Sequence, residues 1–167
     1  MKLSIIIPCY NERNTIKKVI KSVNDSPIDN IEIILVNDGS NDGVEEIFNS
    51  KIFDNVKIIN HKKNLGKGAS IRTGLKYVTG SITIIQDADL EYNPKEYPIL
   101  IKPILEHNAD VVYGSRFQGG NPHRVVYFWH MIGNSFLTLL SNIFTDLNLT
   151  DMETGYKAFK TNVFKSI

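Results

Sequence analysis

Short apolar runs alternate along this chain with segments whose apolar residues recur every three or four positions. Continuous apolar runs of about four to eight residues are typical of buried strands, and the spacing of three and four is typical of helices. The pattern predicts strands at 4–7, 31–36, 56–59, 81–85 and 110–113.

The segments between these strands carry the helical spacing. Their apolar positions are Ile16, Val19, Ile20 and Val23; Val44, Ile47 and Phe48; Ile71, Leu75 and Val78; and Tyr97, Leu100, Ile101 and Ile104. Proline removes a helical hydrogen bond, so Pro98 and Pro103 are expected to break or kink the last of these helices.

Regular alternation of strand and helix predicts an α/β fold with a mostly parallel, Rossmann-like sheet that helices cover on both faces. At 167 residues and 42% hydrophobic, the chain is long enough for one domain, which we expect to span residues 1–167. Ligands of such sheets bind beyond the carboxyl ends of the strands. That edge is therefore the place to look for a site.

Polar segments follow each of the five predicted strands. They are 8–12, 37–40, 64–68, 86–91 and 114–116. Taken singly, each is an ordinary turn. Together at one edge they supply acidic and amide groups for ribose and base, cations for a diphosphate, and glycines for close approach, which favours a nucleotide-diphosphate site.

The acidic segment after the fourth strand suggests a metal site. In extended backbone, residues two apart point to the same side, so Asp87, Asp89 and Glu91 would converge if the chain stays extended. Carboxylate oxygens are the ligands that Mg²⁺ or Mn²⁺ prefers. The plainer interpretation is a solvated acidic turn.

Charge and composition exclude several classes of function. The 19 basic and 18 acidic residues are interspersed, which gives no stripe for nucleic acid. Cys9 is the single cysteine, so no internal disulfide is expected, and a buried packing role in a reducing compartment fits best. Gly66-Lys67-Gly68 lacks the spacing of a P-loop, and no dinucleotide-binding glycine motif follows the first strand.

Residues 125–149 form a wide apolar surface that two interpretations fit. One is a core helix or a pair of them, because apolar spacing does not say what the face packs against. The other is an interfacial helix, in which Phe128 and Trp129 touch lipid while Arg124 and His130 stay near head groups. No run approaches the roughly 20 apolar residues of a membrane-spanning helix.

Several motifs together resemble family 2 glycosyltransferases, and within them the polyprenyl-phosphate glycosyltransferases, the group of dolichyl-phosphate mannose synthase. The motifs are Ile5-Ile6-Ile7-Pro8-Cys9-Tyr10-Asn11-Glu12, Val36-Asn37-Asp38-Gly39-Ser40, Asn64-Leu65-Gly66-Lys67-Gly68, Asp87-Ala88-Asp89-Leu90, Gly114-Ser115-Arg116-Phe117 and Asp151-Met152-Glu153-Thr154-Gly155-Tyr156-Lys157. The resemblance implies a GT-A fold and transfer of a hexose, with inversion, from a nucleotide diphosphate sugar to a lipid phosphate.

The resemblance also implies roles for individual residues. The nucleotide would be bound by Pro8, Tyr10, Glu12, Asp38, Lys67 and Asp87. Asp89 would bind the divalent metal, with Glu91 standing where the family often has glutamine. Arg116 would hold the acceptor phosphate in line with the anomeric carbon, and the position of a second basic residue falls on His130, with Arg124 nearby.

Two further expectations follow from the resemblance. The family's catalytic domain normally continues beyond the Asp151 motif, so the chain is expected to be a C-terminally truncated form. It is expected in the cytoplasm, held weakly at the inner face of a membrane.

Two alternatives stay open. The acceptor could be a sugar or protein hydroxyl, with Asp151 as the general base, or the chain could bind a sugar nucleotide without turnover. A phosphatase that uses an aspartyl-phosphate is disfavoured. Its Asp-x-Asp motif would follow the first strand and precede a threonine, whereas Leu90 and Glu91 follow the motif here.

Overall fold

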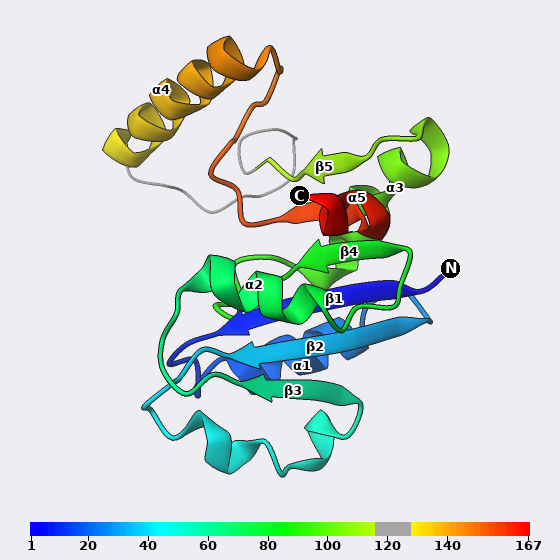
Figure 1. The fold of residues 1–167 in the computed structure, drawn as a ribbon, viewed down its shortest axis with the longest axis vertical. Helices are drawn as coiled ribbons and strands as arrows, with labels where there is room; N and C mark the ends of the chain where they lie inside the picture. Colours follow the sequence, from blue (N-terminus) through cyan, green and yellow to red (C-terminus); the bar gives the residue numbers. More distant parts are fainter. Residues whose placement is uncertain (116–127) are drawn as a thin grey trace.

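The computed structural model describes residues 1–115 and 128–167 and contains a sheet of six strands in the order β3-β2-β1-β4-β6-β5 (Figure 1). The strands are β1 (Leu3–Cys9), β2 (Ile31–Asn37), β3 (Val56–Asn60), β4 (Ile82–Ile85), β5 (Val111–Tyr113) and β6 (Lys157–Lys160). β1 pairs in parallel with β2 and β4, and β2 pairs in parallel with β3. β6 is antiparallel to both of its neighbours, so β5 runs in the same direction as β4. The prediction of a mostly parallel α/β sheet is confirmed.

Helices cover both faces of this sheet, as predicted. The helices of the described residues are α1 (Ile16–Asn24), α2 (Lys67–Leu75), α3 (Tyr97–His107), α4 (Phe128–Thr145) and α5 (Thr161–Ser166), with 3-10 turns η1 (Val44–Ile47), η2 (Lys51–Phe53) and η3 (Pro94–Glu96). Of these, α4 lies away from the sheet (Figure 1). Figure 1 shows α2 on one face and α1 on the other.

The alternation of side chains along β1 explains how the two faces are filled. Ile5 and Ile7 belong to the larger core, together with α1 and α3, whereas Ile6 faces the opposite way and packs in the smaller core under α2. The four apolar positions predicted for the first helix are all buried. Burying a side chain of this size is worth about 1.5–3 kcal/mol relative to exposure, so these contacts hold the helix to the sheet.

The predictions for three helical segments are confirmed only in part. The segment after β2 forms the 3-10 turns η1 and η2 instead of one helix. α2 buries Ser70 and Gly74 against the sheet, where a Cβ at Gly74 would lie 2.7 Å from Cγ2 of Ile6, and the predicted positions Leu75 and Val78 pack in the smaller core beside them. α3 runs unbroken through Pro103, while Pro98 sits in its first turn, where proline is tolerated.

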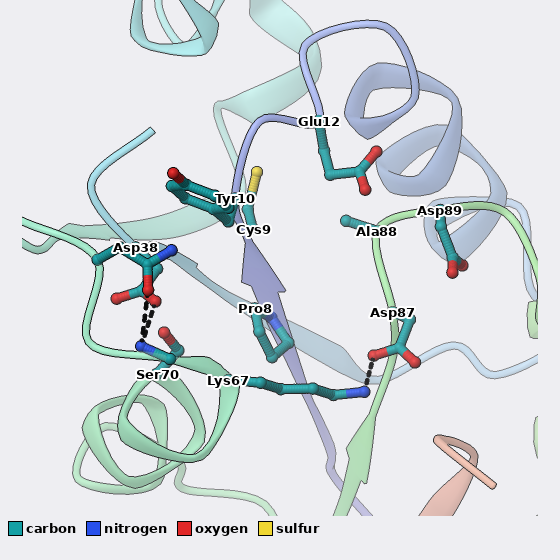
Figure 2. A pocket seen from close by; sticks show the side chains of 12 residues that line it. Pro8, Cys9, Tyr10, Glu12, Asp38, Lys67, Ser70, Asp87, Ala88 and Asp89 are labelled. Carbon is teal, nitrogen blue, oxygen red and sulfur yellow. Dashed lines mark hydrogen bonds and ion pairs between the residues drawn. The ribbon is translucent and has the colours of Figure 1, made fainter. Parts of the chain in front are cut away.

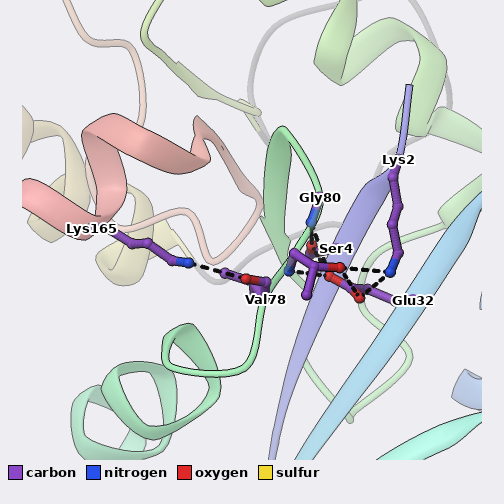
Figure 3. A network of polar contacts seen from close by, with 7 residues as sticks. Lys2, Ser4, Glu32, Val78, Gly80 and Lys165 are labelled. Carbon is purple, nitrogen blue, oxygen red and sulfur yellow. Dashed lines mark hydrogen bonds and ion pairs between the residues drawn. The ribbon is translucent and has the colours of Figure 1, made fainter.

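A polar network closes the edge of the sheet opposite to the carboxyl ends of the parallel strands (Figure 3). The carboxylate of Glu32 on β2 accepts hydrogen bonds from the hydroxyls of Ser4 and Thr79 and from the backbone N–H of Thr79 and Gly80, and it pairs with the ammonium of Lys2. Burial alone would raise the pKa of Glu32, but these partners outweigh it and lower that pKa from 4.5 to about 2. The network ties the turn before β4 to β1 and β2.

The lowered pKa of Glu32 predicts a specific dependence of stability on pH. A carboxyl whose folded pKa is depressed contributes stability above its unfolded pKa, and that stability is lost as pH falls through the folded value. We expect the midpoint of thermal unfolding to fall as pH drops from about 5 to about 2, and Glu32→Gln to have a lower midpoint at pH 7 and a shallower decline on acidification.

Glu106→Gln is the matched control, because Glu106 is an exposed carboxylate whose ion pair with Lys102 is 3.7 Å long. Its unfolding midpoint should decline on acidification as steeply as that of the parent. An equally steep decline in Glu32→Gln would contradict the stabilising role of the Glu32 carboxylate.

Candidate functional site

A cleft of about 350 Å³ opens at the carboxyl ends of β1, β2 and β4 (Figure 2). It is lined by Pro8, Cys9, Tyr10, Glu12, Asp38, Asn64, Gly66, Lys67, Ser70, Asp87, Ala88 and Asp89. Its size falls in the range of small-molecule sites. The sequence placed its six nucleotide-binding candidates and Asp89 at this edge, and the structure brings all seven to one cleft. Their individual roles stay predictions.

Asp38 is the most heavily bonded group in the cleft. Its carboxylate receives hydrogen bonds from Nδ1 of His61 at 2.6 Å, from the N–H of Leu65 at 3.0 Å and from the N–H of Gly66 at 2.8 Å. Burial alone would raise the pKa of Asp38, but these three donors hold it below its usual value. The carboxylate is therefore an anion that holds the segment leading into α2 in place.

Sequence reasoning missed His61, which lies at the end of β3. Its ring bridges two elements, because Nδ1 meets Asp38 and Nε2 lies 2.9 Å from the hydroxyl of Thr73 on α2. The backbone also comes close here, since a Cβ at Gly39 would lie 2.5 Å from the carbonyl carbon of Lys63, and Gly39 has a φ of +67°. A glycine after Asp38 is required for both reasons. A histidine directly after a strand that neighbours an acidic loop was the available signal.

Side-chain bonds also join the loops after β1 and β2. The N–H of Asn11 donates to the hydroxyl of Ser40, and the side-chain oxygen of Asn11 accepts from the N–H of Asn41. The N–H of Arg13 donates to Asp42 in the same way. These bonds fix the wall of the cleft that carries Tyr10, whose ring is 44% exposed.

Cys9 lies in the same wall but is closed to solvent, with 1% of its surface exposed. Burial raises the pKa of its thiol to about 12. It is therefore protonated at neutral pH, and the predicted packing role is confirmed.

Lys67 and Asp87 face each other across the cleft. Lys67 is the first residue of α2, and its ammonium lies 2.5 Å from Oδ1 of Asp87, just after β4 (Figure 2). The pair places a positive charge directly against the first carboxylate of the acidic segment.

The acidic segment does not stay extended, so the expected convergence of its three carboxylates is wrong. Residues 88–89 form a turn, and Leu90 takes a φ of +68°. Oδ1 of Asp89 accepts a hydrogen bond from the N–H of Glu91, which closes a local turn. Glu91 does not line the cleft, whereas Asp87 and Asp89 do.

Two carboxylates of the acidic segment, Asp87 and Asp89, are the candidate ligands for a divalent cation in the cleft. In residues 1–115 and 128–167, no group of three histidine, cysteine or acidic side chains is placed to hold a metal. Mg²⁺ is often held by one or two carboxylates, with water and substrate phosphates completing the shell. Asp87 and Asp89 both line the cleft and fit that pattern, and Asp87 pairs with the ammonium of Lys67 in this structure.

The buried side-chain amide of Gln86 holds the acidic turn in place. The side chain of Gln86 is fully buried, accepts from the hydroxyl of Tyr97 at 3.0 Å, and donates to the carbonyls of Asp87 at 3.1 Å and Tyr92 at 3.4 Å. The N–H of Gly155 donates to the hydroxyl of Tyr92 at 2.8 Å. These contacts join the turn to α3 and to the loop before β6, and the sequence pattern gave no sign of them.

Gly155 and Tyr156 pack directly on the acidic segment. A Cβ at Gly155 would lie 2.2 Å from Oδ2 of Asp87, so only glycine leaves room for that carboxylate. The ring of Tyr156 stacks on Tyr92 at 4.8 Å, and its hydroxyl donates to the carbonyl of Asn93. The Gly-Tyr of the last motif therefore supports Asp87.

Asp151 and its neighbours lie beyond Asp87, toward α4. Asp151 is 1% exposed, and its Oδ1 accepts a hydrogen bond from the amide of Asn134 at 2.9 Å. Lys157, at the start of β6, was not singled out from the sequence. Burial, and then the charge of Lys67, lowers the pKa of Lys157, while Asp151 and Asp87 act in the opposite sense.

α4 is turned so that its polar side faces the body of the protein. Asn134, Thr138 and Asn142 hold the loop at 149–152: Thr138 accepts from the N–H of Met152, and Asn142 exchanges two bonds with Leu149. The outward side is apolar, with large exposed side chains at Trp129, Met131, Ile132, Phe136, Leu137, Leu139, Ile143 and Phe144. The interpretation of this segment as a core helix is wrong for these side chains.

The remaining candidates are placed as follows. His130 is exposed in the first turn of α4. Arg116 and Arg124 lie outside the described residues, as does the side chain of Phe128. The proposed acceptor-phosphate roles of the three basic residues stay predictions.

The bond between Tyr97 and Gln86 gives a prediction about stability. Tyr97→Phe removes the donor and leaves the buried Oε1 of Gln86 without it, which should lower the free energy of unfolding by about 1–3 kcal/mol in urea titrations. Tyr77→Phe is the control, because Tyr77 is 39% exposed, and its effect should stay within about 0.5 kcal/mol. Equal effects of the two substitutions would show that the buried bond does not stabilise the turn.

Solved structures share this fold. Glucosyl-3-phosphoglycerate synthase from Mycobacterium tuberculosis, crystallised with Mn²⁺, UDP and glucosyl-3-phosphoglycerate, superposes with a TM-score of 0.73 at 21% identity. TarS 1-349 from S. aureus superposes with a TM-score of 0.62 at 26% identity. Each match covers 99% of this chain, which spans 59% of the first structure and 49% of the second. The fold is that of the GT-A glycosyltransferases.

Sequence comparison agrees with the fold. UDP-N-acetylglucosamine--dolichyl-phosphate N-acetylglucosaminyltransferase from Methanococcus voltae is 30% identical over 178 residues, covering 96% of this chain and 70% of that protein. Glycosyltransferase GlyA from Streptococcus pneumoniae is 31% identical over 136 residues, covering 81% of this chain and 19% of that protein. The family model of glycosyl transferase family 2 matches residues 4–167. This chain therefore belongs to glycosyl transferase family 2.

Proposed function

We propose that the protein transfers a hexose, with inversion, from a nucleotide diphosphate sugar to a polyprenyl phosphate. The observation that carries the proposal is the cleft itself, in which the anionic Asp38 at one end and Lys67 with two carboxylates at the other suit a nucleoside and a diphosphate. The relative from Methanococcus voltae, named as a dolichyl-phosphate transferase, supports the lipid phosphate.

The bonding of Asp38 favours uridine diphosphate as the nucleotide. A carboxylate offers about four acceptor positions, and His61, Leu65 and Gly66 take three of them. One remaining position matches the single imide N–H of uracil, whereas guanine would present two adjacent N–H donors to the same carboxylate. The UDP bound in the mycobacterial structure and the donor in the archaeal relative's name support this choice.

A divalent cation, Mg²⁺ or Mn²⁺, would be held by Asp87 and Asp89. When bound, such a cation neutralises the charge on a leaving diphosphate. Lys67 would exchange its contact with Asp87 for an oxygen of the diphosphate and so hold the leaving group from α2. Gly155, whose N–H donates to the hydroxyl of Tyr92, would keep Asp87 in place during such an exchange.

The acceptor side fits a phosphate better than a hydroxyl. A lipid monophosphate has a second pKa of about 6 and is mostly dianionic at pH 7, so it attacks without a base. Asp151, the candidate base for a hydroxyl acceptor, is buried and hydrogen-bonded by Asn134, which suits it to orient α4 and the loop after it. Arg116 keeps its proposed role of holding the phosphate in line.

A transfer assay tests the proposal. With Mn²⁺, we expect a UDP-hexose and farnesyl phosphate to give a glycosylated phosphoprenol, while farnesol gives no product. Asp89→Asn should lose transfer and the stabilisation by UDP that depends on Mn²⁺, as measured by thermal unfolding with Mn²⁺ and with EDTA.

Asp54→Asn is the control, because Asp54 is an exposed carboxylate outside the cleft and should behave as the parent. UDP stabilisation that is equal with Mn²⁺ and EDTA would remove the metal from the proposal. Binding of UDP with no transfer to any acceptor would support a binding role without turnover.

We also propose that α4 rests on a membrane surface. Its outward side exposes Trp129 by 77% and Phe144 by 83%, and the helix contains no acidic residue, lysine or arginine. An apolar side that faces away from the body, on a protein whose proposed acceptor is a lipid phosphate, suits the boundary between head groups and acyl chains. Within the described part of the chain, no helix has the length and hydropathy to cross a bilayer.

Liposome co-sedimentation tests this attachment. The parent should partition onto vesicles, and Trp129→Ser combined with Phe144→Ser should lower the bound fraction severalfold, because the two side chains supply apolar area to the interface. Ile99→Ser on α3 removes an apolar side chain that is 70% exposed and is the matched control. The same bound fraction for the double variant and the parent would refute the proposal.

A further inference from the structure

Lys157 stands beside the acidic turn on the side away from the nucleoside end of the cleft. It pairs with Ile85, the last residue of β4, so it lies next to the point where the chain leaves the sheet toward Asp87. Its neighbour Ala158 points into the core shared with α1 and α3. Because side chains alternate along a strand, Lys157 projects from the face that α2 covers, where Lys67 also lies.

The contacts of Lys157 within the described residues are weak ones for a lysine. Its ammonium donates to the carbonyl of Met152 at 3.4 Å and lies 4.4 Å from the centre of the Tyr113 ring. Lys160 on the same strand is different: it donates to the side-chain oxygen of Asn108 at 2.6 Å and pairs with Asp110 at 2.8 Å. Lys160 therefore has the close oxygen partners of a lysine that stabilises β6. Lys157 has no partner as close among the described residues.

The two carboxylates that attract the ammonium of Lys157, Asp87 and Asp151, have other partners. Lys67 pairs with Asp87, and the amide of Asn134 donates to Asp151. The ammonium groups of Lys67 and Lys157 act unfavourably on one another. An anion with several oxygens between them would satisfy both, and phosphate is such a group.

Resting on the proposed function, we infer that Lys157 binds a phosphate oxygen of the reacting ligands, on the acceptor side of Asp87. Two phosphates could supply that oxygen, the monophosphate of the prenyl acceptor and the diphosphate of the donor. Both present the same chemistry, and they can be measured separately. In either case Lys157 would be a second ligand-binding cation beside Lys67, supplied by β6 instead of α2.

Calorimetric titration tests the inference without requiring turnover. The affinity for UDP is measured with Mn²⁺, and the affinity for farnesyl phosphate is measured with UDP and Mn²⁺ present, with farnesol reporting binding of the hydrocarbon alone. Lys157→Gln should weaken binding of one phosphate ligand by about tenfold or more, the scale of a hydrogen bond to a charged group. Lys157→Arg should retain most of the affinity, because it keeps the charge.

Lys102→Gln is the matched control, since Lys102 is an exposed lysine on α3, and it should bind as the parent does. Weaker binding of farnesyl phosphate, with unchanged farnesol and UDP, supports the inference with the acceptor as the source. Weaker binding of UDP supports it with the donor as the source.

Equal affinities of the parent and Lys157→Gln for both ligands would overturn the inference while leaving the proposed function intact. A folded parent that binds neither UDP nor farnesyl phosphate would overturn the proposed function, and the inference with it. Thermal unfolding of each variant shows whether it is folded. If Lys157→Gln does not fold, a loss of phosphate binding in a folded Lys157→Met supports the inference, and parent-like affinity overturns it.

Discussion

The parallel pairing of β1 with β2 and β4 is the constraint on which the site depends, because it brings the carboxyl ends of these strands to one edge. The ladder continues past the strands: the N–H of Asp38 donates to the carbonyl of Cys9, and the N–H of Gln86 donates to the carbonyl of Ile6. The first residue after each neighbouring strand is thus still bonded to β1. The cleft inherits the rigidity of the sheet at the point where its loops begin.

Two buried polar groups carry that rigidity further out. Asp38 holds the segment before α2, and Gln86 holds the acidic turn; each makes three hydrogen bonds within the protein. Leaving such a group without its partners costs about 1–3 kcal/mol, so alternative loop arrangements are disfavoured. The geometry of the cleft is therefore set before any ligand arrives, which lowers the ordering cost of binding.

The sequence predicted the elements whose signal is local. Apolar runs located the five parallel strands, and polar residues after them located the cleft. β6 was not predicted, because Ala158 and Phe159, between two lysines, form too short an apolar run to indicate a strand. Its antiparallel position between β4 and β5 also depends on contacts distant in sequence. The bonding roles of Gln86 and His61 were also missed, because their hydrogen-bond partners are distant in sequence. The predicted convergence of Asp87, Asp89 and Glu91 is wrong because the chain turns at residues 88–89 and Leu90 adopts a left-handed conformation. Hydrophobic periodicity gives no signal of either feature.

α4 shows why an amphipathic pattern alone does not give orientation. Its apolar residues have the spacing of a core helix, yet the structure turns the polar row of Asn134, Thr138 and Asn142 inward. That row bonds the loop carrying Asp151, so the helix that exposes Trp129 also fixes the region beyond Asp87. If the outward side rests on lipid, the protein's orientation on the membrane and the position of the acceptor side are set by one rigid element. A lipid phosphate would then be presented at the level of the head groups, where that element lies.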